Sequence, residues 1–108
     1  MAIEYKRVAK VRELSEHRGK LVRIEDEDVA LFKVDGAVYA LSNVCAHQHF
    51  SALHQGEVKG LRVSCPMHGW TYSLITGVAE TGNGKVKAYP VRVEGEHVFV
   101  GVEQGGEK

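Results

Sequence analysis

Both cysteines of this 108-residue chain have a histidine close by in the sequence. Cys45 and His47 stand in "CAH", and Cys65 and His68 stand in "CPMHGW", so the whole pattern is C-x-H-x17-C-x2-H. Two thiolates and two imidazoles can complete the ligand set of zinc, of copper or of an iron–sulfur cluster. The pattern therefore predicts a metal centre rather than two buried cysteines with incidental histidines.

The order of the four residues separates a single zinc ion from a cluster with two metal atoms. A Cys2His2 zinc site usually takes both cysteines from one C-x2-4-C knuckle and both histidines from one H-x3-5-H segment. Here each segment offers one cysteine and one histidine. If each segment sends its cysteine to one iron and its histidine to the other, the result is the arrangement of a Rieske 2Fe-2S centre. The mixed order favours the cluster, and zinc remains the alternative.

Short strands and many turns are predicted to position these residues, so the fold class is all-β. The pair Asp35-Gly36 predicts a tight hairpin turn, and Lys59-Gly60 and Gly95-Glu96 stand where further hairpins would turn. Only residues 11–19 have a helical pattern, of one or two turns at most. We expect strands at 20–26, 29–35, 37–43, 61–65, 71–74, 86–93 and 97–102, where β-branched and aromatic residues gather or apolar and polar side chains alternate.

Size and charge narrow the class of protein. One domain is expected from the length, and Lys plus Arg equals Asp plus Glu at 14 each, which excludes the basic footprint of a protein that binds nucleic acid or an anionic membrane. The first ten residues have no apolar leader core and no twin arginine, and no run approaches the length of a membrane span. We therefore expect a soluble cytoplasmic protein, in which the two reduced cysteines serve as ligands, catalysts or core residues rather than in a disulfide.

The two motifs resemble the Rieske 2Fe-2S family in residue type, order and spacing. The likeness continues through "TYSL" and the ending "AYPVRVEGEHVFVGV", so it covers most of the chain. It implies one Rieske-type 2Fe-2S cluster, with Cys45 and Cys65 on the buried iron and His47 and His68 on the outer one.

The resemblance also implies an architecture, a Rieske-type antiparallel β-sandwich with a small cluster-binding subdomain. We expect a single domain over residues 1–108, in which residues 1–44 and 70–108 form the basal part and residues 45–69 form the cluster-binding lobe. His49 and His54 lie between the two motifs, but the ligand pattern is complete without them.

Departures from the respiratory members of the family narrow the function. Phe50 and Met67 occupy the positions of their disulfide, and Trp70 replaces a serine that donates a hydrogen bond to a cluster sulfur, although Tyr72 matches their tyrosine. Fewer hydrogen bonds to the sulfurs place the potential at the low end of the Rieske range of about −150 to +300 mV. Quinol is therefore not the expected electron donor.

The stretch "CPMHGWTYSL" is most similar to the Rieske domains of ring-hydroxylating oxygenases and to their ferredoxins. An oxygenase subunit needs a further domain with a mononuclear iron, and we expect none after residue 108. The leading hypothesis is a soluble ferredoxin that carries single electrons from a flavoprotein reductase to a terminal oxygenase, and is not itself catalytic. The first alternative is the Rieske-like small subunit of a cytoplasmic nitrite reductase, bound to its large subunit. The second is a zinc-stabilised interaction module without redox chemistry.

Overall fold

One strand in the middle of the chain is buried on both faces. The computed structural model describes residues 2–44, 53–66, 70–80 and 84–104. In the strand Glu27–Val34, the four successive residues from Val29 to Phe32 are all 0% exposed. Successive side chains of a strand point to opposite faces, so an unbroken apolar run requires a layer on each side.

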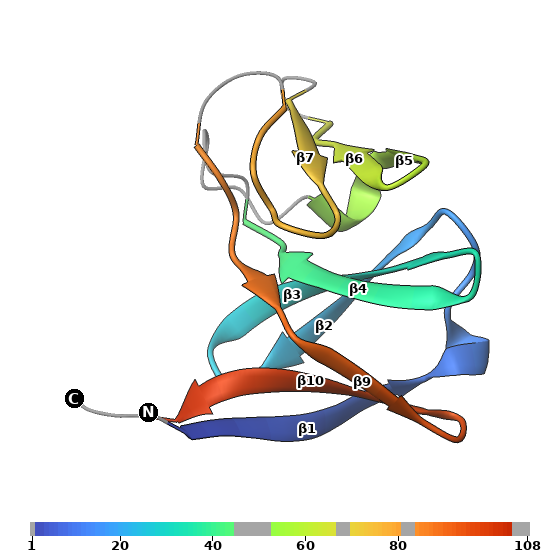
Figure 1. Ribbon diagram of the computed structural model, residues 1–108, viewed down its shortest axis with the longest axis vertical. Helices are drawn as coiled ribbons and strands as arrows, with labels where there is room; N and C mark the ends of the chain where they lie inside the picture. Colours follow the sequence, from blue (N-terminus) through green and yellow to red (C-terminus); the bar gives the residue numbers. More distant parts are fainter. Residues whose placement is uncertain (1, 45–52, 67–69, 81–83, 105–108) are drawn as a thin grey trace.

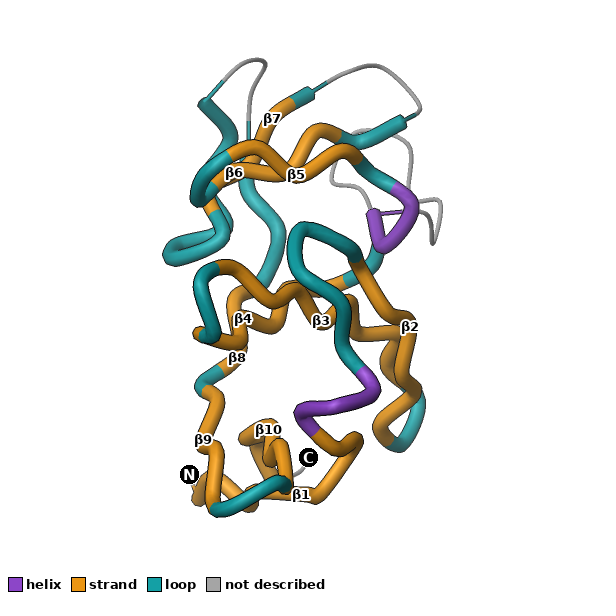
Figure 2. Tube along the Cα trace, turned by 90° about the vertical axis from the view of Figure 1, so that its right-hand side faces the viewer, coloured by secondary structure: helices purple, strands orange, loops and turns teal. Residues whose placement is uncertain are grey.

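The described strands form three antiparallel sheets stacked as layers, with that strand, β3, in the middle layer (Figure 1). The strand orders are β1-β10-β9, β2-β3-β4-β8 and β5-β6-β7, and every named pairing is antiparallel. Figure 2 shows the third sheet at one end, the second sheet in the middle and the first sheet at the other end. The strands are β1 Ala2–Lys10, β2 Gly19–Ile24, β3 Glu27–Val34, β4 Ala37–Ser42, β5 Glu57–Lys59, β6 Arg62–Ser64, β7 Thr71–Ser73, β8 Ala88–Tyr89, β9 Val91–Glu94 and β10 His97–Gln104, and two 3-10 helices are η1 Val11–Glu13 and η2 Leu53–Gln55.

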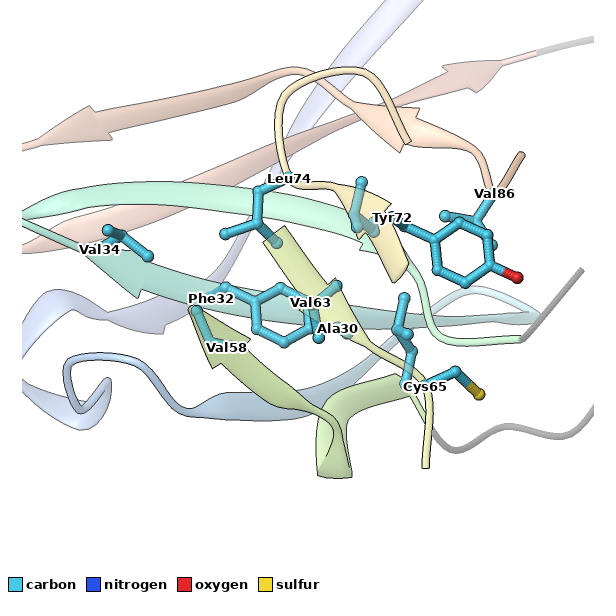
Figure 3. Close-up of a cluster of buried hydrophobic side chains, with 11 residues drawn as sticks. Ala30, Phe32, Val34, Val58, Val63, Cys65, Tyr72, Leu74 and Val86 are labelled. Carbon is cyan, nitrogen blue, oxygen red and sulfur yellow. The ribbon is translucent and has the colours of Figure 1, made fainter. Parts of the chain in front are cut away.

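Each face of the middle sheet packs into its own hydrophobic core. Val29 and Leu31 of β3 join residues of β1, β2, β4, β8 and β10 in the core between the first and second sheets. Ala30 and Phe32, from the other face of β3, join the core shared with the third sheet, which Figure 3 shows in close-up. That second core consists of Ala30, Phe32, Val34, Leu41, Leu53, Val58, Val63, Cys65, Tyr72, Leu74 and Val86.

The predicted all-β fold is confirmed, and so are its hairpin turns. Asp35 and Gly36 have φ of 52° and 83° between the paired strands β3 and β4, as a two-residue turn with positive φ at both positions requires. Turns also join β5 to β6 at Gly60 and β9 to β10 at Gly95, with φ of 59° and 62°.

The strand boundaries differ from the predicted ones at several places. The predicted strand 86–93 is interrupted at Pro90, which has no N–H to donate, and becomes β8 and β9. The expected helical turn is only the three residues of η1. Strands β1 and β5 were not predicted, and β7, placed in the basal part by the sequence, pairs with β6 in the third sheet. The division into a basal part and a cluster-binding lobe stays a prediction.

Phe32→Ala should test whether the second core holds the layers together. Removing a fully buried phenyl ring leaves a cavity that costs about 3–5 kcal/mol of unfolding free energy. Ile75→Ala is the control, because Ile75 is 58% exposed and its loss should change stability by less than about 0.5 kcal/mol. Denaturant unfolding of both variants measures the difference, and equal midpoints would contradict this account of the core.

Candidate functional site

The ends of the segment that contains the first motif are joined by Asn43, at the end of β4. Asn43 is 0% exposed and is the one buried polar side chain recorded among the described residues. Its N–H donates to the Asp28 carbonyl at 2.9 Å, and its own carbonyl accepts the N–H of Leu53 at 3.1 Å. Its side-chain Oδ1 accepts the N–H of His54 at 2.5 Å. Asn43 therefore fixes where this segment leaves β4 and where it enters η2.

His54 makes a second contact with the same amide oxygen. Its ring nitrogen Nδ1 lies 3.2 Å from Asn43 Oδ1, which can only accept, so Nδ1 carries the hydrogen. The neutral ring then has its lone pair on Nε2, on the opposite edge. From the sequence, His54 is only a residue that the ligand pattern does not need; in the structure it is half-buried and belongs to the closure of this segment.

The second motif lies in the connection between β6 and β7. Ser64 pairs with Thr71 as the last rung of this hairpin, and their side-chain oxygens are 3.0 Å apart. Beyond that rung, the N–H of Cys65 donates to the Trp70 carbonyl at 2.7 Å. Cys65 and Trp70 thus form the base of a six-residue loop, and Trp70 also packs against the second core.

Cys65 itself is 1% exposed. Figure 3 shows it at the end of β6, with its sulfur directed away from Phe32 and Val58 and lying at the same end of the core as the Tyr72 hydroxyl. Tyr72 is 0% exposed, so the aromatic residue that resembles the family tyrosine belongs to the same core as the thiol.

A third connection is tied to the base of the second motif. The N–H of Ala79 donates to the Gly84 carbonyl at 3.0 Å, and the N–H of Glu80 donates to the Thr71 carbonyl at 2.7 Å. The Glu80 carboxylate also pairs with Arg62 of β6. The residues on either side of "TGN" at 81–83 are therefore anchored to the β6–β7 hairpin.

The bases of the first and second motifs are close in the fold. After η2 the chain enters β5 within two residues, and Glu57 of β5 pairs with Ser64, the residue before Cys65. Leu53 and Cys65 share the second core. Of the four predicted ligands the structure describes Cys65, and it brings the flanks of the other motif to the same end of the molecule.

Cys45, His47 and His68 lie outside the described residues, as do His49, Phe50 and Met67. Within the described ranges, no group of three or more His, Cys, Asp or Glu side chains could hold a metal ion. The four-residue ligand set therefore stays a prediction.

The comparison with protein families decides the assignment. A family model described as "Rieske [2Fe-2S] domain" matches residues 4–93. The chain belongs to the Rieske [2Fe-2S] domain family. Its cofactor is accordingly a Rieske-type 2Fe-2S cluster, as expected from the two motifs.

Relatives of this Rieske chain include electron carriers. The ferredoxin component of the naphthalene 1,2-dioxygenase system of Pseudomonas aeruginosa is 32% identical over 81 residues, which are 73% of this chain and 77% of the relative. The crystal structure of a Sphingomonas yanoikuyae ferredoxin matches with a TM-score of 0.83 and 28% identity, over 93% of this chain and all of that one. A small-subunit candidate for an NADH-dependent nitrite reductase of Mycobacterium tuberculosis matches with a TM-score of 0.90, over 96% of this chain and 99% of that one, but at 23% identity it shows the shared fold alone.

The described part of the Rieske site suits its cluster. A thiolate buried in an apolar core needs a positive partner, because an unpaired charge there is very costly, and an iron of the cluster would supply that partner to Cys65 if it is a ligand as predicted. The backbone N–H of Cys65 donates to Trp70 at the end of the β6–β7 hairpin, and this hydrogen bond holds the cysteine at the base of the second motif. In the described part of this Rieske chain, no helix has the length and apolar character needed to cross a membrane.

Asn43 was not identified from the sequence, where it was only the last residue of a predicted strand. The available signal was a polar residue ending an apolar strand two positions before Cys45. Its partners Leu53 and His54 lie ten and eleven residues further on, and nothing in the spacing links them to it.

Asn43→Ala should weaken the Rieske site through the first segment. The buried N–H of His54 would lose its acceptor, at a cost of about 1–3 kcal/mol, and the end of the segment would be released from β4. We expect a lower unfolding temperature and faster loss of the visible cluster absorption on heating.

Ser73→Ala is the matched control. Ser73 Oγ also accepts two backbone N–H groups, from Ile75 and Thr76, but in an exposed turn at the other end of β7. If both variants lost the cluster at the same rate, the closure by Asn43 would not be specific to the site.

Proposed function

We propose that this chain is a soluble, cytoplasmic Rieske-type ferredoxin that carries single electrons from a flavoprotein reductase to a terminal oxygenase. The observation that carries the proposal is the 32% identity to a dioxygenase ferredoxin component over 77% of that protein. In this proposal Cys45 and Cys65 hold one iron, and His47 and His68 hold the other.

The bound cluster supplies a one-electron couple, and the residues of the chain set its properties. Two neutral imidazoles in place of two thiolates make the site less negative, so they raise its potential above that of an all-cysteine ferredoxin. Asn43 and the Cys65–Trp70 hydrogen bond hold the bases of the two ligand segments. The Tyr72 ring and the second core exclude water from the cysteine side.

A second candidate is the small subunit of a nitrite reductase. A small-subunit structure of that class has the same fold over nearly the whole of both chains, with a TM-score of 0.90, so the fold of this chain fits that candidate as well. Co-purification from the native source with a large sirohaem subunit would support this candidate, and a chain that elutes alone while it accepts electrons from a reductase would support the ferredoxin.

Metal analysis should separate the cluster from the zinc module. We expect about two irons and two acid-labile sulfides per chain, with visible absorption that zinc cannot give. Cys65→Ala should abolish assembly, because one iron would lose half of its protein ligands. His54→Ala is the control, since the backbone N–H that donates to Asn43 remains, and it should keep full iron content. One zinc and no sulfide per chain would refute the assignment of the four residues as ligands of a 2Fe-2S cluster.

A charge placed near the ligand histidines should slow transfer without removing the cluster. From the sequence, Met67 flanks His68, and we expect Met67→Glu to reduce the rate of electron transfer to an oxygenase several-fold by repelling or displacing the partner. Ile75→Glu is the control, because exposed Ile75 follows the far end of β7. Reconstituted turnover with reductase and oxygenase measures both. Normal turnover by Met67→Glu, or the same slowing in both variants, would place the contact elsewhere.

A further inference from the structure

A polar cleft of about 380 Å³ lies between the start of the second sheet and η2. One wall is the turn that leads into β2, and the other is the helix that follows the first motif. The cleft is lined by His17, Arg18, Gly19, His54, Gln55 and Gly56.

Backbone hydrogen bonds fix the first wall of the cleft, and its glycine lies close to the backbone of the second wall. The N–H of Arg18 donates to the Ser15 carbonyl at 3.2 Å and that of His17 to the Lys33 carbonyl at 2.8 Å, so the turn is fixed to β3. A Cβ added at Gly19 would lie 2.4 Å from the His54 carbonyl oxygen. Only glycine allows β2 to approach η2 this closely, and the cleft is therefore built into the fold.

The titratable side chains that line the cleft are an arginine and two histidines, with no carboxylate among the described lining residues. No recorded salt bridge joins Arg18 to a described residue. Glu57 directly follows Gly56, and its carboxylate lies 3.6 Å from Lys59 Nζ. Glu16 directly precedes His17 and interacts with it electrostatically, and its two carboxylate oxygens accept the N–H groups of Asp35 and Gly36 at 2.7 and 2.9 Å. The hydrogen bond from Gly36, and to a smaller extent that from Asp35, lowers the pKa of Glu16 below its usual value and so favours the anionic carboxylate.

His54 links the cleft to the first motif. Its Nδ1 is taken by Asn43 Oδ1, so Nε2 is the ring nitrogen left for a group in the cleft. No recorded hydrogen bond joins Nε2 to a described residue. The same histidine thus lines the cleft and contacts the residue that closes the segment of Cys45 and His47.

We propose that this cleft binds an oxyanion, namely the carboxylate of an acidic side chain on the redox partner protein. The Arg18 guanidinium supplies a fork of N–H donors that matches a carboxylate, the His17 imidazole lines the same cleft, and the volume admits one side chain. The partner supplies the carboxylate because η2 follows directly on the segment that carries Cys45 and His47, where a partner must approach to exchange electrons. The choice of partner rests on the proposed function, while the oxyanion site does not.

Binding of inorganic phosphate to the purified holo-protein tests the site directly. Titration at constant ionic strength, with chloride as the balancing salt, should show saturable binding by calorimetry. Arg18→Gln should weaken it at least fivefold, with the visible spectrum of the cluster unchanged. Arg7→Gln removes the same charge from exposed β1 and should bind as the wild type does. Absent binding, or equal weakening by Arg7→Gln and Arg18→Gln, would overturn the site.

Electron-transfer kinetics with the reductase and the oxygenase test the occupant. Arg18→Gln should raise the KM for this chain at least fivefold with little change in kcat, and phosphate should compete in the wild type but not in the variant. If phosphate binding is lost in Arg18→Gln while KM stays unchanged with both proteins, the occupant is a free anion and the partner assignment is wrong. If the wild type exchanges no electrons with either protein, the proposed ferredoxin function fails while the phosphate titration still judges the oxyanion site.

Discussion

The hydrogen bonds of one buried amide, Asn43, are the constraint on which the site depends. A buried polar side chain is tolerated only when its partners are in place, because each missing hydrogen bond leaves an unpaid desolvation cost. The Asn43 side chain meets this condition because its Oδ1 accepts from His54, on the far side of the first motif, while the Asn43 backbone carbonyl accepts the N–H of Leu53. Folding of the core therefore also closes the segment. The second motif is closed by a backbone hydrogen bond between Cys65 and Trp70 at the end of a hairpin, so its closure does not need a buried polar side chain.

The two closures are coordinated because they share one core. Leu53, next to His54, and Cys65 both pack in the core between the second and third sheets, and β5 connects them along the chain. Phe32 and Ala30 of β3 form the floor of that core, while the opposite face of β3 supports the first sheet. One face of β3 therefore packs under the residues that close the motifs, and its other face packs against the first sheet and stabilises the fold.

The sequence predicted what depends on nearby residues and missed what depends on distant ones. The Asp35-Gly36 turn needs positive φ at two adjacent positions, so two residues suffice to predict it. Strand β1 reads "AIEYKRVAK" and was missed, because four charged residues hide a strand that exists through its pairing with β10. At the site, the strand that leads to the second motif was predicted at 61–65 from its own residues, and the structure has it as β6, Arg62–Ser64. Asn43 was missed because its role requires Leu53 and His54 to return to it, which tertiary structure alone decides.

Two hollows on the described surface differ in the residues that an occupant would contact. The larger one, of about 690 Å³, is lined mainly by apolar residues of η1, β4 and β9, with Val38 and Val91 among them. Its lining comes from η1, β4, β9 and the turns beside them, and includes none of the residues that close the two motifs. The smaller cleft is one hydrogen bond from Asn43, through His54. An occupant of the larger hollow would touch strands that hold the fold, whereas an occupant of the smaller one would touch the residue that fixes the first motif. For a protein whose function depends on the two motifs, connection to their closures is therefore a better guide to a binding site than size or apolar character.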